Sequence, residues 1–128
     1  MIAIDTSSIV AYLSGASGAD VEKIEEALDR KILVLPPVVL AELLSDPSLS
    51  KKAIESICAL PVLEITDQKY WQRVGIMRSK LIAKKLKSRL ADSLIAQICI
   101  DYDIPLVTRD KDFAHFKKYF SLKLWSKD

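Results

Sequence analysis

Hydrophobic positions along this chain follow two patterns that alternate from the N-terminus to the C-terminus. Short runs of β-branched and other apolar residues, such as residues 2–5 and 32–35, have the length and composition of buried strands. Between them lie longer segments, such as residues 20–30, in which apolar residues recur at helical spacing. Strands that alternate with helices are typical of an α/β domain with a parallel sheet. We therefore expect a parallel sheet of about five strands flanked by helices.

The expected elements follow from these patterns together with the residues that start and end helices. Asp67 and Ser88 can cap the two helices that follow them, and Pro37 suits a first helical turn. Functional groups in such sheets gather at the carboxyl ends of the strands. The expected strands are residues 2–5, 32–35, 62–65, 106–107 and 122–124, and the expected helices are residues 6–13, 20–30, 37–44, 50–60, 68–87 and 89–102, with a short helix after Asp110.

Length and composition are those of one globular domain spanning residues 1–128, with 50% hydrophobic and 28% charged residues. The N-terminus lacks a basic region of the signal-peptide type, and the longest apolar run, residues 32–41, is too short to span a bilayer. Cys58 and Cys99 lie among apolar residues, so we expect buried free thiols in a reducing compartment. These features predict a soluble cytoplasmic protein without a membrane segment.

Two carboxylates stand out early in the chain. Asp5 ends the first predicted strand, where a charge suits an edge that opens into a crevice, although capping of the next helix is an equally simple role. Glu42 is the only charge in a helix that is otherwise apolar all round. Such a helix is expected to be buried, and its carboxylate then requires a cation. A partly exposed Glu42 at the helix end is the alternative.

Two further acids lie in the second half of the chain. Asp92 shares a helix face with Ile95 and Cys99, which predicts that it points inward, although an acid in a first turn is also favoured by the helix dipole. Asp110 follows the fourth predicted strand, where it can bind a metal or cap the short helix. The neighbouring Asp112 is a second candidate ligand, and Thr108 can orient one of these carboxylates.

Four converging carboxylates without a cation would repel one another and raise one another's pKa values. Oxygen ligands select hard cations, so Mg²⁺ or Mn²⁺ is the expected cofactor. The only histidine, His115, is expected to be a surface or packing residue. The sequence therefore predicts a carboxylate metal centre at Asp5, Glu42, Asp92 and Asp110.

Positive charge is concentrated in one segment even though the net charge is only +2. Residues 68–91 contain eight basic residues and no acid, and they lead directly to Asp92. Such a stripe suits a phosphate backbone, although a solvated helix face is an equally common reason for it. Residues 84–87 carry no aromatic side chain, so base stacking is not indicated there. The candidate RNA-binding residues are Lys84, Lys85, Lys87, Arg89 and Arg109.

The ordered acidic motifs resemble those of the PIN-domain family, and the resemblance extends over essentially the whole chain. It implies that Asp5, Glu42, Asp92 and Asp110 surround Mg²⁺ or Mn²⁺, with support from Thr108 and Ser7. Many relatives carry a glycine before the third acid, where this chain has residues 87–90 without one. The matching segments are Ile4-Asp5-Thr6-Ser7, residues 39–44, residues 91–96 and residues 106–113.

The length and layout look like VapC-type toxins, the ribonuclease half of VapBC toxin–antitoxin pairs. This resemblance implies a metal-dependent endoribonuclease that hydrolyses RNA phosphodiester bonds, forms a homodimer and is held by a cognate antitoxin. A catalytically weak PIN-like subunit that docks protein or RNA is the alternative. A receiver domain would need a second acid close to Asp5, and an aspartyl phosphatase would need an aspartate where Ser7 stands. Both of these classes are therefore disfavoured.

Overall fold

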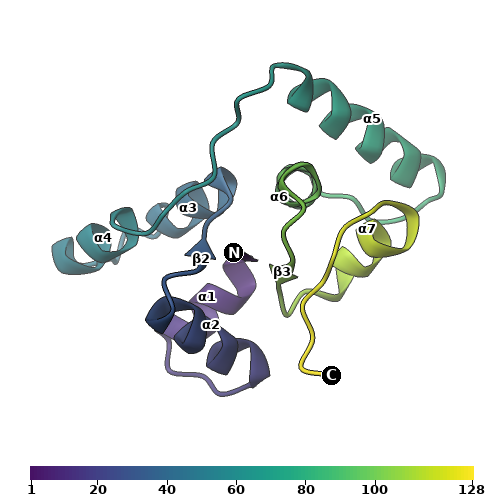
Figure 1. The fold of residues 1–128 in the computed structure, drawn as a ribbon. Coiled ribbons are helices and arrows are strands. Elements are labelled where there is room, and N and C mark those ends of the chain that lie inside the picture. The colour runs from purple at the N-terminus through teal and green to yellow at the C-terminus, as the bar shows by residue number, and fades with distance from the viewer.

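Three short parallel strands form the centre of the molecule. The computed structural model describes residues 1–128, and its strands are β1 (Ile2–Ile4), β2 (Leu33–Val34) and β3 (Leu106–Val107) in the order β2-β1-β3. Ala3 of β1 pairs with Val34 on one side and with Leu106 on the other. All strand residues are buried, because helices flank the sheet as expected for parallel strands. Figure 1 shows the helices arranged around this small sheet.

The two outer strands of the predicted sheet are reduced to single bridges. Leu35 pairs with Val62, and Leu106 pairs with Leu124, each in parallel orientation. The sheet therefore has three strands rather than about five, although both predicted edge segments lie where a fourth and a fifth strand would lie. Beside Leu35 the ladder cannot continue, because the next two residues, Pro36 and Pro37, lack a backbone N–H and begin a helix.

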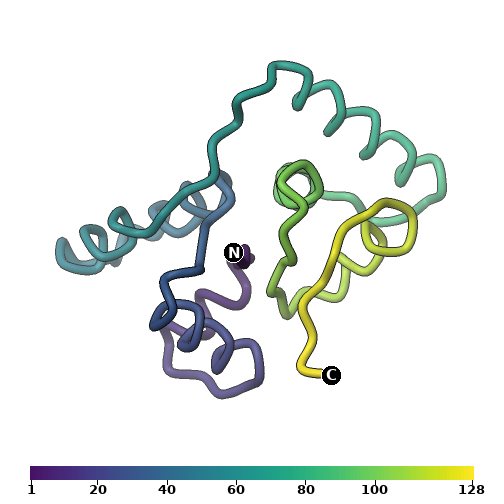
Figure 2. The backbone as a smooth tube through the Cα atoms, viewed as in Figure 1, coloured from purple at the N-terminus to yellow at the C-terminus, as the bar shows by residue number.

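Seven α-helices and one 3₁₀ turn surround the sheet, close to where the hydrophobic pattern predicts them. Figure 2 follows the chain from the N-terminal strand at the centre of the molecule to the C-terminal segment, which leaves α7 and passes beside β3. The helices are α1 (Thr6–Leu13), α2 (Ala19–Asp29), α3 (Pro37–Leu44), α4 (Lys51–Cys58), α5 (Lys69–Ala83), α6 (Leu90–Tyr102) and α7 (Ala114–Tyr119), and η1 (Lys111–Phe113) precedes α7.

The segment between α5 and α6 differs from the prediction. Helix α5 ends at Ala83 rather than near Lys87, because Lys85 adopts a left-handed backbone conformation with φ of 60°. The N–H of Leu86 then donates to the carbonyl of Leu81, which closes the helix as a Schellman motif. Residues 84–89 consequently form an exposed basic loop instead of a last helical turn. This loop is the direct connection from α5 to the first turn of α6.

The two capping predictions for these helices have different outcomes. The Asp67 carboxylate accepts a hydrogen bond from the backbone N–H of Lys69 at 2.9 Å, as a residue at the start of α5 should. Ser88 does not cap α6, because its hydroxyl bonds that of Ser93 at 2.9 Å and the residue before the helix is Arg89. The buried Ser88 side chain therefore joins the loop to α6 by a contact between side chains.

The core is continuous from the sheet into α6. Ile95, Ala96 and Cys99 of α6 are buried, as the helical periodicity predicts. Cys58 is exposed at the end of α4, so the prediction that both thiols are buried is wrong for this residue. Helix α4 has only Ile57 fully buried, and Ala53 is half-buried. No helix is long and apolar enough to cross a bilayer.

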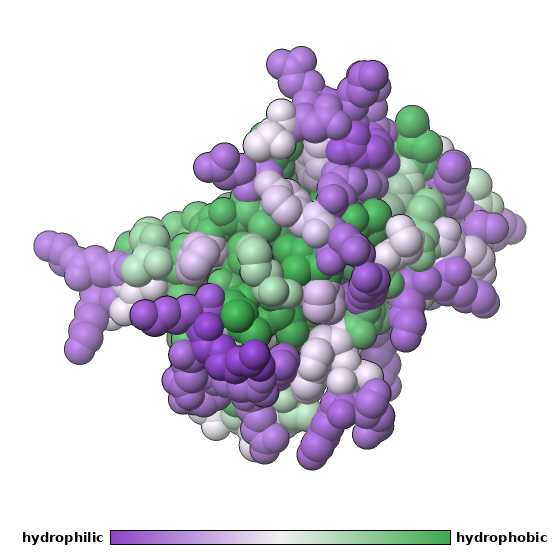
Figure 3. All heavy atoms as spheres, in the orientation of Figure 1, coloured by the Kyte–Doolittle hydropathy of each residue, from purple (hydrophilic) through white to green (hydrophobic).

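Apolar surface remains uncovered on part of the molecule. Figure 3 shows apolar side chains gathered on the left of the view, over the region of α3 and α4, whereas charged side chains project from the rim. An apolar groove of about 520 Å³ runs between α1, α2 and α4. Its lining includes Leu13, which is 55% exposed. Exposed apolar surface of this kind is typical of a docking site.

Candidate active site

Asp5 occupies the carboxyl end of β1 and is only 5% exposed. Its side chain makes no capping hydrogen bond to α1, which removes the simplest alternative for this residue. Instead, the Asp5 Oδ2 atom accepts hydrogen bonds from Ser7 Oγ at 2.7 Å and from Thr108 Oγ1 at 2.8 Å. Two hydroxyl groups therefore hold the Asp5 carboxylate in one orientation.

Ser7 and Thr108 also join the ends of two neighbouring strands. The backbone N–H of Arg109 donates to Ser7 Oγ at 3.1 Å, and the backbone N–H of Asp110 donates to Thr108 Oγ1 at 3.0 Å. Because β1 and β3 are adjacent, their carboxyl ends open at the same edge of the sheet. The structure thus places both predicted supporting residues beside Asp5.

Three further carboxylates meet next to this edge. One oxygen each from Asp92, Asp110 and Asp112 lies within 4.8 Å of the others. Asp92 comes from the first turn of α6, whereas Asp110 and Asp112 come from the start of η1. The Asp110 Oδ1 atom accepts the backbone N–H of Asp112 at 2.9 Å, so Asp110 caps η1 and faces the group at the same time. His115, half-buried in α7, does not belong to this group.

The electrostatics of the site are set by like charges in a poorly solvated place. The pKa of Asp92 is raised to about 6, first by burial and then by the negative charges of Asp110, Asp5 and Asp112, whereas Arg89 lowers it. Asp5 therefore acts on Asp92 electrostatically although it lies outside the tight group of three. An assembly of four acids of this kind is stabilised by a bound cation.

Glu42 lies differently from the prediction. Helix α3 buries only Val39 and Leu43, and Glu42 faces solvent, so the helix is not buried all round. The Glu42 Oε1 atom accepts a hydrogen bond from Thr6 Oγ1 at 2.7 Å. Glu42 is therefore connected to the residue that follows Asp5, but it is not part of the group formed by the other acids.

The basic loop of residues 84–89 lies at the border of the acidic group. Lys87 Nζ is 3.4 Å from Asp112 Oδ2, and this ion pair connects the loop directly to the acids. Lys84, Lys85 and Arg89 are exposed in the same loop. Four of the five predicted RNA-binding residues therefore lie in one exposed loop, and Lys87 and Arg89 are the two that interact with the acids.

Arg109 is the exception, because its guanidinium is occupied within the protein. Its Nε and Nη2 atoms donate to Asp20 Oδ2 at 2.6 Å and Asp20 Oδ1 at 2.9 Å, and Nη2 also donates to the carbonyl of Ser17 at 2.9 Å. The Arg109 guanidinium, with help from Ser8, lowers the pKa of Asp20 to about 2. This geometry favours a structural role for Arg109 over the predicted contact with RNA.

Asp20 was not singled out by the sequence, and its partners explain why. The buried Ser8 hydroxyl donates to Asp20 Oδ2 at 2.9 Å, and the pair with Arg109 spans 89 positions of the chain. Gly18 makes room for this arrangement, because a Cβ atom there would lie 2.7 Å from Asp20 Oδ1 and 2.9 Å from Arg109 Nη2. The only available signal in the sequence was the pair of glycines, Gly15 and Gly18, just before the second predicted helix.

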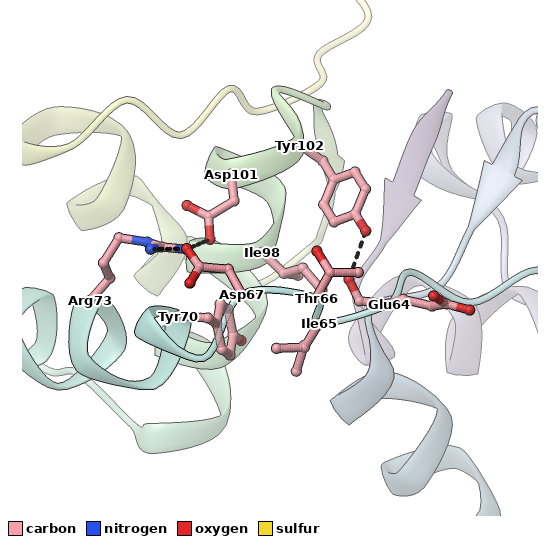
Figure 4. A pocket seen from close by; sticks show the side chains of 9 residues that line it. All are labelled: Glu64, Ile65, Thr66, Asp67, Tyr70, Arg73, Ile98, Asp101 and Tyr102. Carbon is pink, nitrogen blue, oxygen red and sulfur yellow. Dashed lines mark hydrogen bonds and ion pairs between the residues drawn. The ribbon is translucent and has the colours of Figure 1, made fainter.

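A second polar cluster lies at the opposite end of α6 (Figure 4). Arg73 stands between two carboxylates, with Nη1 at 2.8 Å from Asp67 Oδ2 and Nη2 at 2.6 Å from Asp101 Oδ2. These side chains line a pocket of about 430 Å³ together with Tyr102, whose hydroxyl donates to the carbonyl of Glu64 at 2.6 Å. Asp101 follows Asp92 by nine positions, which is roughly 13 Å along a helix. This cluster is therefore separate from the candidate active site.

Comparisons with solved structures find the same architecture in several proteins. A chain in the crystal structure of VapBC2 from Rickettsia felis, bound to a DNA fragment from its promoter, is 26% identical with a TM-score of 0.72, and 100% of both chains is covered. VapBC-1 from nontypeable Haemophilus influenzae contains a chain with a TM-score of 0.77 and 19% identity, with 98% of each chain covered. A chain of FitAcB from Neisseria gonorrhoeae has a TM-score of 0.70 and 18% identity, covering 98% of this chain and 97% of that one.

A comparison with curated protein sequences gives no significant match. The model of the PIN domain, in contrast, matches residues 2–119, which includes every element from β1 to α7 and every acid of the site. The small parallel sheet, its flanking helices and the acidic group at its edge all lie within this match, and this chain belongs to the PIN domain family.

Proposed function

We propose that this protein is a metal-dependent endoribonuclease that hydrolyses RNA phosphodiester bonds with Mg²⁺ or Mn²⁺ as cofactor. The observation that carries this proposal is the group of Asp92, Asp110 and Asp112, whose carboxylate oxygens lie within 4.8 Å of one another beside the buried Asp5. PIN domains form a family of nucleases, which supports hydrolysis as the reaction class.

The donor set fits a hard divalent cation. All of its members are carboxylates, and neither histidine nor cysteine takes part, which favours Mg²⁺ or Mn²⁺ over zinc. The pKa of Asp92 is raised first by burial and then by the negative charges of Asp110, Asp5 and Asp112, and a bound cation would offset both causes. We assign Asp5, Asp92 and Asp110 as ligands, with Asp112 beside them. Glu42, bonded to Thr6, would contribute from the rim of the site.

When bound, the cation supplies positive charge that offsets the charge of a phosphodiester undergoing hydrolysis and that activates water for attack. The protein's own residues orient the reaction. Ser7 and Thr108 hold the Asp5 carboxylate in one orientation, so that it is preorganised for the reaction. Lys87, whose Nζ atom is 3.4 Å from Asp112 Oδ2, and the exposed Arg89 would bind phosphates of the RNA backbone near the scissile bond.

The decisive experiment compares cleavage of labelled single-stranded RNA in Mg²⁺, in Mn²⁺ and in EDTA. We expect Asp5→Asn and Asp92→Asn to reduce the cleavage rate by about a hundredfold or more, because each removes a ligand charge. Asp103→Asn is the matched control, since Asp103 is an exposed acid that pairs with Lys123 far from the site. Circular dichroism shows whether each variant is folded.

The outcomes separate the two function classes. Cleavage that requires metal and is lost in both site variants supports the nuclease. Binding of RNA by the folded wild-type protein without cleavage under any of these conditions supports the alternative, a catalytically weak docking module. Full activity of Asp5→Asn would rule out the assigned metal centre.

We further infer that the protein is the toxin half of a toxin–antitoxin pair. The similar chains come from VapBC complexes, and the apolar groove between α1, α2 and α4 offers a surface for an apolar segment of an antitoxin. Expression of this chain alone should then arrest growth, and co-expression of the protein encoded beside it should restore growth. Leu13→Asp should prevent that rescue, because it places a charge in the groove. Rescue of the Leu13→Asp variant would locate the partner elsewhere.

A further inference from the structure

Tertiary structure brings an aromatic ring to the basic loop, which has none of its own. Lys84 Nζ lies 4.7 Å from the ring centroid of Tyr119, and Lys118 Nζ lies 5.2 Å from the same centroid. Tyr119 ends α7 and is 39% exposed, so the ring stands at the surface between two ammonium groups. Figure 1 shows the end of α5 meeting α7 in this region.

This cluster of Lys84, Lys118 and Tyr119 connects to the acidic group along both segments of the chain. Lys87, three residues after Lys84, pairs with Asp112 at 3.4 Å. Asp112 belongs to η1, which continues directly into α7 and so to Tyr119. The cluster and the acids are therefore two ends of one surface strip.

The charges of the cluster have no counterion in the protein. Neither Lys84 nor Lys118 makes an ion pair with a carboxylate, and the adjacent Lys85 and Lys117 make none either. A lysine over an exposed ring is held only weakly, so the ring orders the ammonium groups without neutralising them. Ammonium groups gathered in this way attract an anion, and a phosphate of a nucleic-acid backbone is an anion of suitable size.

We propose that Tyr119 holds Lys84 and Lys118 as a binding site for a backbone phosphate of the single-stranded RNA that leaves the acidic group. The proposal rests on the proposed function, since RNA is the substrate assumed there. Tyr119 is in this view a positioning residue, which acts through the two lysines. The RNA strand would then follow the surface strip from the acids to Tyr119.

The test measures binding without cleavage, so that it does not depend on nuclease activity. Fluorescence anisotropy of a labelled single-stranded RNA is recorded with the full chain in EDTA at several salt concentrations. Lys84→Gln and Lys118→Gln should each weaken affinity by about three- to tenfold and reduce the salt slope by about 1. Lys51→Gln, at an exposed position of α4, is the control and should change neither quantity.

Tyr119 is tested by one disruptive and one conservative variant. Tyr119→Leu should weaken affinity and reduce the salt slope as the lysine variants do, because the lysines lose their common platform. Tyr119→Phe keeps the ring and should bind as the wild type does. Adding Tyr119→Leu to the double lysine variant should have no further effect, because the positioned groups are already gone.

Three results would overturn the proposal: wild-type affinity of Tyr119→Leu, a weakened affinity with an unchanged salt slope, or lysine variants that behave like Lys51→Gln. An unchanged slope would mean that a base stacks on the ring instead. Failure of the nuclease proposal would appear separately, as wild-type protein that does not cleave RNA in Mn²⁺ while these binding results stand.

Discussion

Asp92 shows how the environment of one residue links stability to function. Its pKa is raised to about 6 by burial and by the neighbouring acids, so the folded protein holds this proton more tightly than the unfolded chain does. The ionised form required for metal binding is therefore present at neutral pH at the expense of stability. Sites that combine several like charges with a shifted pKa are typical of functional centres.

The pH dependence of stability without metal follows from this shift. For an acid with a raised pKa, the folded state binds more protons, so the free energy of unfolding should rise as the pH falls from about 7 through 6 towards 4. Asp92→Asn should be more stable than the wild type at pH 7 and should lack this rise. Urea denaturation in EDTA at pH 5, 6 and 7 measures both effects. If the free energy of unfolding changed with pH in the same way for both proteins, the raised pKa would not belong to Asp92.

Asp20 provides the opposite case, a carboxylate whose ionised form the fold stabilises. Arg109 and Ser8 lower its pKa to about 2, so its contribution to stability is present above about pH 4 and is lost as the pH falls towards 2. Asp20→Ala should lower the free energy of unfolding at pH 7 by on the order of 2 kcal/mol, because charge-assisted hydrogen bonds are lost.

The interaction of Asp20 with Arg109, called here the Asp20 clamp, is tested by thermal and urea denaturation of Asp20→Ala and of Gly18→Ala. Gly18→Ala should destabilise as well, since its methyl group would displace the Asp20 and Arg109 side chains and its φ of 147° disfavours alanine. Glu22→Ala, at an exposed position of the same helix, serves as the control. If neither variant differs from this control in its free energy of unfolding, the Asp20 clamp does not stabilise the fold.

At the scale of elements, α6 connects two polar clusters with different tasks. Its first turn carries Asp92 into the candidate active site, and its last turn carries Asp101 to Arg73 of α5. Tyr70 of α5 adds a hydrogen bond of 2.6 Å from its hydroxyl to the carbonyl of Leu94. Helix α5 is thereby held against α6, and the position of the basic loop between them is determined.

Removal of the ion pairs of Arg73 with Asp67 and Asp101 should therefore lower the stability of the protein without changing the rate of RNA cleavage. Arg73→Met breaks the contacts with Asp67 and Asp101 and leaves two carboxylates without their common partner, which should lower the urea midpoint. The rate of RNA cleavage by the folded variant should stay within about twofold of wild type, because the cluster lies roughly 13 Å from Asp92 along the helix. A large loss of activity in fully folded Arg73→Met would show that the two clusters are coupled.

At the scale of the whole molecule, apolar surface outside the groove offers an interface for the homodimer that the family resemblance implies. Trp71 of α5 is 58% exposed beside an apolar depression of about 190 Å³ formed with residues 36–38 of α3 and its preceding turn. A large aromatic side chain next to such a depression is typical of the centre of a protein interface.

If the wild-type protein is a homodimer through this surface, Trp71→Glu should convert it to a monomer, because a charge would be buried at the centre of the interface. Light scattering coupled to size-exclusion chromatography gives the mass of each variant. Ile76→Glu is the matched control, since Ile76 is equally exposed on α5 but does not line the depression. A wild-type protein that is monomeric, or a dimeric Trp71→Glu variant, would contradict this interface.

Much of the fold was predictable because it depends on local patterns. The hydrophobic periodicity predicts the α/β class, the seven helices and the three central strands, and the family resemblance is confirmed by the match over residues 2–119. Asp5, Asp92, Asp110 and Thr108 could be singled out because each follows a strand or faces inward on a helix, and the ends of parallel strands share one edge. Ser7 was indicated only by the family resemblance.

The sequence by itself thus determined the helices, the three central strands and the positions of Asp5, Asp92 and Asp110 near the sheet edge, since these follow from spacing along the chain. Only the tertiary structure decided which charged side chains have a partner within the protein. The pair of Arg109 with Asp20 joins positions 89 residues apart, and the ring of Tyr119 reaches Lys84 from another helix. Neither contact leaves a local pattern, because charged side chains on a surface carry no periodicity that records their partners. Glu42 likewise faces solvent because the packing of α3, and not its composition, sets which face is covered.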